Sequence, residues 1–146
     1  MINAKIKNNV RLPKFVNLSK ELAHIANRII VPDIQSHIDK GQDITGKRYA
    51  PLASSTIRAK GGDSRKLIET GKLRSNYQVI TGGNRVKIRP RASRRDVARY
   101  LQVEGVKSNT YGRRRFHFFD VSLKAEQRGV KYFEEVIRRL IRTNAR

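Results

Sequence analysis

The residues of this chain that could bind a metal ion or transfer a proton are three histidines and twelve acidic residues. Zinc sites need three or four converging ligands, and the sequence contains neither a cysteine nor a His-x-x-x-His pair. His24 and His37 lie on either side of Pro32, so a helix would not bring them to one face. Asp33 precedes His37 by four residues, a helical spacing that we interpret as a surface pair.

The patterns of the common catalytic sites are also missing from the sequence. Asp39 and Asp43 flank a loop, but no further acid in that segment completes the carboxylate cluster of a two-metal nuclease. The pairs Gly61-Gly62 and Gly82-Gly83 lack the Gly-Lys-Ser/Thr ending of a phosphate-binding loop, and no Gly-x-Ser-x-Gly elbow occurs. We therefore predict a protein that is not an enzyme and that uses no cofactor or metal.

The composition favours one folded domain of strongly basic character. The chain has 146 residues, with 33 Lys or Arg against 12 Asp or Glu and a formal net charge of +21. Leu, Ile, Val and Phe make up about 27 % of the residues, above the roughly 20 % below which a highly charged chain is expected to stay disordered. The longest apolar run, Ile29-Ile30-Val31, is far too short to span a bilayer. We therefore expect a soluble, intracellular protein without membrane contact.

The positive charge is unevenly distributed along the chain. Residues 1–20 carry five cations and no acid, and residues 85–115 carry eleven cations and two acids. Such a concentration usually faces an anionic partner, either a phosphate backbone or an acidic protein surface. We predict that residues 1–16 form a basic N-terminal arm ahead of a single α+β domain at 17–146.

Two amphipathic helices are predicted, one near each end of the domain. Apolar residues recur at intervals of three and four over about 18–40, and Gly41 should end this first helix. Pro32 should kink or restart it because proline lacks a backbone N–H. Ser122 should cap a final helix over about 123–142. The predicted core stripe of that helix is Val130, Phe133, Val136, Ile137, Leu140 and Ile141.

Between these helices the sequence predicts a long loop region and a small antiparallel sheet. Residues 41–74 are rich in Gly, Ser, Thr and Lys with scattered apolar residues, which indicates a loop region anchored to the core. Residues 75–91 predict a β-hairpin that turns at 81–84. A short helix with a capping box at 93–96, a basic loop at 106–114 and a strand at 116–119 should follow. The hairpin is expected to pack against the two long helices.

The second strand of this hairpin predicts a basic surface. Val86 and Ile88 alternate with three cations, so one face should be buried and the other positively charged. The candidate contacts with an anionic partner are Arg85, Lys87, Arg89, Arg91, Arg94, Arg95, Arg113, Arg114 and Arg115. Among these cations lie Tyr100, Tyr111 and Phe116, which could stack on bases, although we expect Phe116 in the core with Phe118 and Phe119. One hypothesis is therefore a nucleic-acid-binding module with non-specific, salt-dependent phosphate contacts.

An ordered set of short motifs resembles the tail-completion (virion morphogenesis) proteins of tailed bacteriophages, which are neck or head–tail joining proteins. The order and spacing of the motifs agree with that family over about residues 18–142. Tyr49 stands where the family usually has Trp, and the proline expected near Arg115 is missing. The motifs are Gly46-x-x-Tyr49-x-Pro51-Leu52-x-x-x-Thr56-Ile57-x-x-Lys60, Leu67-Ile68-x-x-Gly71-x-Leu73, the hairpin, Gln102-x-x-Gly105 and Arg115-Phe116-x-Phe118-Phe119.

The resemblance implies a structural virion protein that is assembled in the host cytoplasm and forms a ring, commonly six-fold, where the tail meets the head connector. Its expected neighbours are head-connector and tail-tube or terminator proteins around the DNA passage. Of the basic hairpin's two candidate partners, packaged DNA and an acidic neighbouring ring, we favour the acidic ring. A basic accessory protein of another assembly, such as a ribosome or a secretion machine, is a third hypothesis.

The loop region supplies the candidate assembly anchors. An aromatic residue, a rigid turn and an aliphatic residue could dock together into a pocket of a neighbouring subunit. The same residues could equally pin the loop to the core of their own subunit. The candidate anchors are Tyr49, Pro51, Leu52, Thr56 and Leu73.

Overall fold

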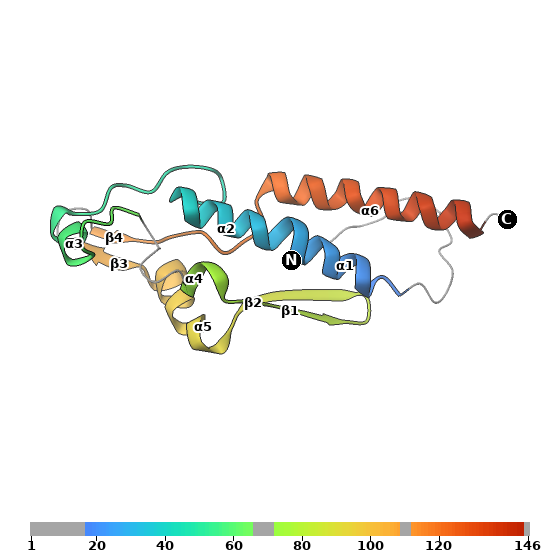
Figure 1. Ribbon diagram of the computed structural model, residues 1–146, viewed down its shortest axis with the longest axis horizontal. Coiled ribbons are helices and arrows are strands. Elements are labelled where there is room, and N and C mark those ends of the chain that lie inside the picture. Colours follow the sequence, from blue (N-terminus) through green and yellow to red (C-terminus); the bar gives the residue numbers. More distant parts are fainter. Residues whose placement is uncertain (1–16, 66–71, 109–111, 145–146) are drawn as a thin grey trace.

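The computed structural model describes residues 17–65, 72–108 and 112–144, and these residues have an α+β fold. Figure 1 shows a central helical segment between a long C-terminal helix on one side and a β-hairpin with two short helices on the other. A second, smaller hairpin and a short helix lie at one end. No helix in this part of the chain is both long and apolar enough to cross a membrane. The predicted arm at 1–16 lies outside the described residues.

The central segment is one helical path made of three pieces. Helix α1 covers Ser19–Ile25, the π-helical η1 covers Ala26–Ile30, and α2 covers Val31–Lys40. The wide π turn comes directly before Pro32, whose nitrogen cannot donate to the carbonyl four residues back. The predicted kink or restart takes the form of this π turn, which ends at Ile30, and the backbone stays helical through Pro32. Gly41 ends α2 in the left-handed conformation, with a φ of 61°, as predicted.

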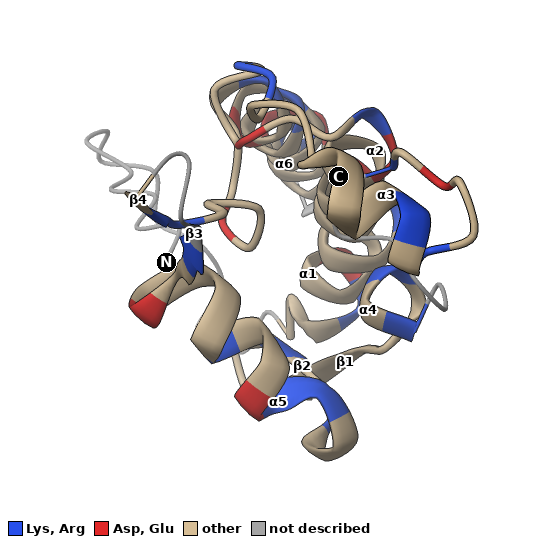
Figure 2. Cartoon of the chain, turned by 90° about the vertical axis from the view of Figure 1, so that its left-hand side faces the viewer, with Lys and Arg blue, Asp and Glu red and all other residues tan. Residues whose placement is uncertain are grey.

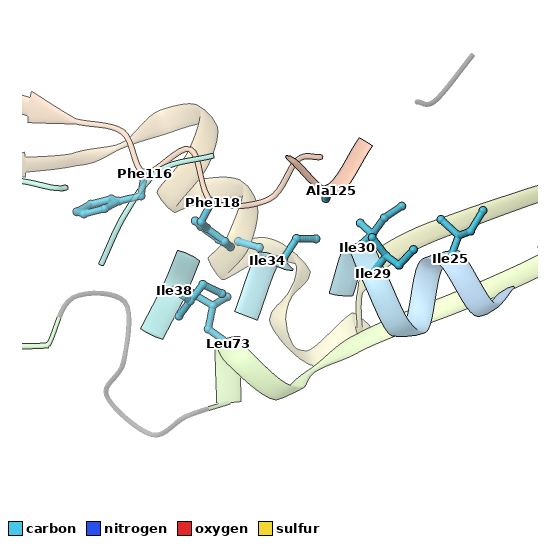
Figure 3. Packing of buried hydrophobic residues seen from close by; sticks show 10 residues of the cluster. Ile25, Ile29, Ile30, Ile34, Ile38, Leu73, Phe116, Phe118 and Ala125 are labelled. Atoms are coloured by element: carbon cyan, nitrogen blue, oxygen red, sulfur yellow. The ribbon is translucent and has the colours of Figure 1, made fainter. Parts of the chain in front are cut away.

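The core is centred on a stripe of isoleucines along this segment. The stripe consists of Ile25, Ile29, Ile30, Ile34 and Ile38, which follow the helical interval and are all buried. Figure 3 shows buried side chains from other parts of the chain converging on the stripe. These are Leu73, Ala98, Phe116, Phe118 and Ala125.

The predicted β-hairpin is present on the face of α1 that lies away from the C-terminal helix (Figure 1). Strands β1 (Tyr77–Gly82) and β2 (Arg85–Pro90) pair antiparallel, with Val79 opposite Ile88. Gly82 pairs with Arg85, so the turn contains two residues instead of the four that we predicted.

The tip of the hairpin holds the beginning of α1. The Asn84 Oδ1 accepts a hydrogen bond from the backbone N–H of Leu18 at 3.2 Å. The Ser19 hydroxyl donates to the Gly83 carbonyl. The first backbone N–H groups of a helix have no partner within the helix. At the start of α1, the Leu18 N–H finds its partner in a residue 66 positions away in the sequence.

The predicted capping box is wrong, although the helix that it should begin is present. Helix α5 covers Ala92–Arg99 and continues as the π-helical η2 over Tyr100–Glu104. Arg91 occupies the N-cap position, and Ser93 is already inside the helix, so its hydroxyl makes no cap hydrogen bond. Gly105 ends the helix as expected.

Two predictions about residues 106–119 are wrong: the segment expected to be a loop contains strands, and the segment expected to be a strand is irregular. The expected basic loop contains strands β3 (Val106–Ser108) and β4 (Gly112–Arg114), which form a second antiparallel hairpin. The expected strand at 116–119 is irregular backbone: the Phe116 N–H donates to the Leu101 carbonyl, the His117 carbonyl accepts from the Ile44 N–H, and the groups of Phe119 bond to a side chain. The Gln102 amide donates to the Phe119 carbonyl at 3.0 Å and accepts from the Phe119 N–H at 3.1 Å. At Phe119 a side chain therefore replaces a neighbouring strand.

The loop region begins in a tight turn and contains short helices. In the turn, the Asp43 Oδ1 accepts hydrogen bonds from the Thr45 hydroxyl and from the N–H groups of Thr45 and Lys47. The Thr45 hydroxyl is the largest cause of a lowered pKa of the Asp43 carboxyl. Helix α3 covers Ser54–Ala59, and α4 covers Lys72–Ser75.

The C-terminal helix α6 covers Leu123–Asn144. The Ser122 hydroxyl accepts a hydrogen bond from the Ala125 N–H at 3.1 Å, so the predicted cap is confirmed. Two residues of the predicted core stripe, Val130 and Ile141, are exposed instead. The helix turns Ala125, Gly129 and Val136 inward because Gly129 lies against Ile25, where an added Cβ would be 3.3 Å from Cγ2.

The glycine at the end of η2 gives the first testable prediction. Gly105 has a φ of 77°, and an added Cβ would lie 2.6 Å from the Arg114 carbonyl oxygen. Gly46 has a φ of 88° but nothing within 4 Å of the same position, so it is the matched control. Gly46→Ala should lower the free energy of unfolding by about 1 kcal/mol because of backbone strain alone. Gly105→Ala should lower it by about 2 kcal/mol more because of the added clash, and urea denaturation measures both losses. Equal losses would contradict the close approach of β4 to Gly105.

Candidate interaction surface

The predicted basic face of the hairpin is formed as expected. In β2, Val86 and Ile88 are half-buried, and Ile88 packs against the core. The three alternating cations are exposed, and we call them the basic ladder: Arg85, Lys87 and Arg89. Within the described residues the ladder makes no ion pair, and Arg89 donates a long hydrogen bond of 3.4 Å from its Nε to the Gln78 Oε1. Its charge is therefore available to an external partner.

The six remaining candidate cations fall into two groups. Arg91 and Arg95 are exposed at and just after the start of α5, which contacts β2, whereas Arg94 is half-buried. These three arginines therefore belong to the helix next to the strand that carries the ladder.

The second group belongs to the small hairpin at the other end of the molecule. Arg113 and Arg115 are exposed there, while the Arg114 Nη1 donates to the Pro51 carbonyl at 3.2 Å. Figure 2 shows the two groups apart, on β2 and α5 and on β3 and β4. The nine cations therefore do not form a single patch.

The candidate anchors divide between the subunit's own core and its surface. The Tyr49 ring meets Phe116 edge-to-face with centroids 4.9 Å apart, and Leu73 is buried in the core. Leu52 is half-buried, and Pro51 and Thr56 are exposed. This arrangement favours the interpretation that Tyr49 and Leu73 hold the loop region to their own subunit. Pro51 and Thr56 remain available to a neighbour.

The pair of Asp33 and His37 is more enclosed than a surface pair. The Asp33 Oδ2 lies 3.4 Å from the His37 Nε2, and their side chains are only 10 % and 15 % exposed. The expectation of a surface pair was therefore wrong, because α2 turns this side of the helix partly inward. Among the described residues, no group of three His, Cys, Asp or Glu residues converges in a way that could hold a metal ion.

Sequence reasoning missed a second kind of surface, which is apolar. Six large hydrophobic residues of the described chain are exposed. Two of them, Val130 and Ile141, had been predicted to lie in the core. The seven-residue spacing of Leu123 and Val130 was nevertheless visible in the sequence. A helix with apolar residues on more than one third of its circumference should have indicated a second contact. The six are Val97, Tyr100, Val103, Leu123, Val130 and Ile141.

The described residues present chemistry that suits binding to macromolecules: a basic ladder, a second basic group and exposed apolar helix faces. Searches of family models, curated proteins and solved structures find no match to this chain. The functional argument therefore rests on the residues and their arrangement.

The environment of Tyr49 gives a prediction that separates the two interpretations of the anchors. Its hydroxyl is buried without a hydrogen-bond partner among the described residues, and burial raises its pKa. Tyr49→Phe should therefore leave the free energy of unfolding unchanged or raise it by up to about 1 kcal/mol. Tyr49→Ala should lower it by about 3 kcal/mol, because the contact with Phe116 is lost. A Tyr49→Ala variant of normal stability that no longer self-associates would instead identify Tyr49 as an assembly anchor.

Proposed function

We propose that this chain is a structural subunit of a tailed-bacteriophage neck, a tail-completion protein that joins the tail to the head connector. In this proposal it forms a homomeric ring, six-fold by family resemblance, around the DNA passage of the virion. Its neighbours are head-connector and tail-tube or terminator proteins, and it performs no catalysis.

The observation that carries the proposal is the ordered set of motifs, of which several described residues contact one another. Leu67, Ile68 and Gly71 of the second motif lie outside the described residues. Tyr49 of the first motif packs on Phe116 of the last. Gln102 binds both backbone polar groups of Phe119, and Gly105 lies against the backbone of Arg114. These residues come from distant positions and depend on one another. A family that shares their order would therefore share the scaffold and not only short local patterns.

The basic ladder supports a role as a joint between rings. An exposed cationic row that makes no ion pair with the described residues is suited to an acidic surface on a neighbour. Proteins that let DNA slide past them gain little from tight phosphate contacts, so we assign the ladder to an acidic neighbouring ring. Contact with packaged DNA then stays weak and non-specific.

A specific observation also favours a second candidate, the nucleic-acid-binding module. Tyr100 is exposed directly after Arg99, an arrangement that could stack a base beside a phosphate contact. This module should bind duplex or single strands as an isolated subunit, and its affinity should fall steeply with salt.

Light scattering and negative-stain microscopy of nuclease-treated full-length protein test the proposal. We expect rings free of nucleic acid at about 0.1 M salt that persist at about 0.5 M salt, because apolar contacts resist screening. A monomer that binds added duplex at the lower salt and releases it at the higher would favour the nucleic-acid module. A monomer at high protein concentration that ignores DNA would contradict self-assembly into rings.

Charge reversal tests the role of the ladder. The triple variant Arg85→Glu, Lys87→Glu and Arg89→Glu should keep its circular dichroism and melting temperature, because these side chains face away from the core. It should lose binding to the neighbouring ring in a reconstitution assay. The control reverses three exposed cations elsewhere, Arg28, Arg58 and Arg128, with the same change in net charge. Equal loss in both variants would show that only total charge matters.

A further inference from the structure

One edge of the β1–β2 hairpin carries backbone groups that point away from the partner strand. Pairs along an antiparallel sheet alternate between hydrogen-bonded and non-bonded. Tyr77 lies opposite Pro90, which has no N–H to exchange, so this pair and every second pair after it are non-bonded. The residues of β1 in these pairs turn their N–H and C=O groups outward. They are Tyr77, Val79 and Thr81.

No other described segment pairs with this edge. Within the part of the chain that the structure describes, β1 pairs with β2 alone, and Tyr77, Val79 and Thr81 make no backbone hydrogen bond to another element. Helix α1 contacts both strands, and the side chains of Tyr77 and Ile88 face the core. Thr81 is exposed and Val79 is half-buried. The edge can therefore take a further strand.

The two edges of the hairpin differ in how well they resist such pairing. Sheet edges that stay unpaired usually carry charged side chains or proline. Strand β2 has both, in the basic ladder and Pro90. Strand β1 reads Tyr-Gln-Val-Ile-Thr-Gly, with no charge, no proline and three β-branched residues. The edge of β1 is therefore the one suited to a partner.

The charge on the outer face of the hairpin selects the chemistry of that partner. The residues of β1 on this face are uncharged and lie directly opposite the basic ladder. Residues 72–95 contain no Asp or Glu, so acids of the hairpin and its flanks do not offset the ladder. The Arg89 Nε already reaches across to the Gln78 Oε1 at 3.4 Å. Ladder side chains therefore extend over β1 toward its free edge.

A second copy of this chain is a poor source of the added strand. Residues 1–20 carry five cations and no acid. A strand from this segment would place like charges beside the ladder, which destabilises a sheet. An extended segment with acidic side chains would instead place opposite charges there.

We propose that an acidic extended segment of a neighbouring ring protein adds to β1 as a third strand. Its backbone pairs with Tyr77, Val79 and Thr81, and its acidic side chains lie on the outer face beside the basic ladder. Backbone pairing supplies the geometry of the contact, and the ladder supplies its selectivity. The inference rests on the proposed function and specifies how the acidic neighbour binds.

A titration of the full-length protein with short synthetic peptides tests the choice of an acidic strand. The probe is an end-capped peptide that alternates Glu and Val, because alternation places every Glu on one face of a strand. Calorimetry at about 0.1 M salt measures its affinity. The Glu peptide should bind at least about ten-fold more tightly than the same peptide with Gln in place of Glu. Equal affinities would overturn the role of the ladder.

Two N-methylated forms of the Glu peptide test the backbone pairing. One carries the methyl groups on the Val nitrogens and the other on the Glu nitrogens. Alternate residues of a strand point their N–H groups to the same edge, so only one form should lose affinity, by about ten-fold or more. Equal behaviour of the two forms would overturn the addition of a strand.

A substitution in β1 gives the matching test on the protein. Thr81→Pro removes an outward N–H and leaves the pairing with β2 intact, and Thr81→Ala is the control because it keeps that N–H. Both variants should keep the circular dichroism of the unmodified chain. Thr81→Pro should weaken binding of the Glu peptide about ten-fold, and Thr81→Ala should not. Equal affinities of the two variants would contradict pairing at this edge.

The outcomes separate this inference from the proposed function. Binding of the Glu peptide that ignores N-methylation would refute strand addition and leave the acidic neighbour in place. Rings seen by microscopy without binding of the peptide would refute only the inference. A monomer that ignores the peptide but binds duplex DNA would refute both and favour the nucleic-acid module.

Discussion

The packing of the isoleucine stripe is the interaction on which the other parts of the fold depend. A net charge of +21 opposes compaction, so the favourable term has to come from apolar burial, at about 25 cal/mol per Å². One helical segment supplies half of the buried cluster, and α4, α5, α6 and the segment 116–118 contribute one or two side chains each. Phe116 and Phe118 pack in this cluster and so hold the irregular segment 116–119 against the helix. The contact of Phe116 with Tyr49 in turn holds the loop region.

Much of this fold was predictable because its strongest patterns are local. The helical interval of the isoleucines, Pro32, Gly41 and the hydroxyl of Ser122 each act within one or two turns, and the structure has them where the sequence placed them. The conformations at 106–119 were not predictable from such patterns. The amide of Gln102 satisfies the backbone of Phe119, and this long-range contact removes the need for a paired strand.

The candidate surface shows the same division between local and long-range information. Alternation in β2 predicted the exposed ladder correctly, because a strand side chain faces one side or the other. The nine candidate cations are close in the sequence but divide between two surfaces. The path of the chain between α5 and β4 sends Arg113 and Arg115 to the other hairpin. Val130 is exposed because α6 packs with Gly129 against Ile25, which turns Val130 away from the core. This close packing between distant residues was not visible in the sequence.

The hairpin tip that caps α1 has a mechanical consequence. Asn84 and Gly83 hold Leu18 and Ser19, and the strands lie along the helix for the length of their contact. A pull on the strands along their own axis would load these contacts in parallel, so they would have to fail together. A pull away from the helix would open them one after another, beginning at the tip. The fold is therefore stiff along the hairpin and compliant across it, and tension applied to the hairpin would be transmitted best along the strand direction.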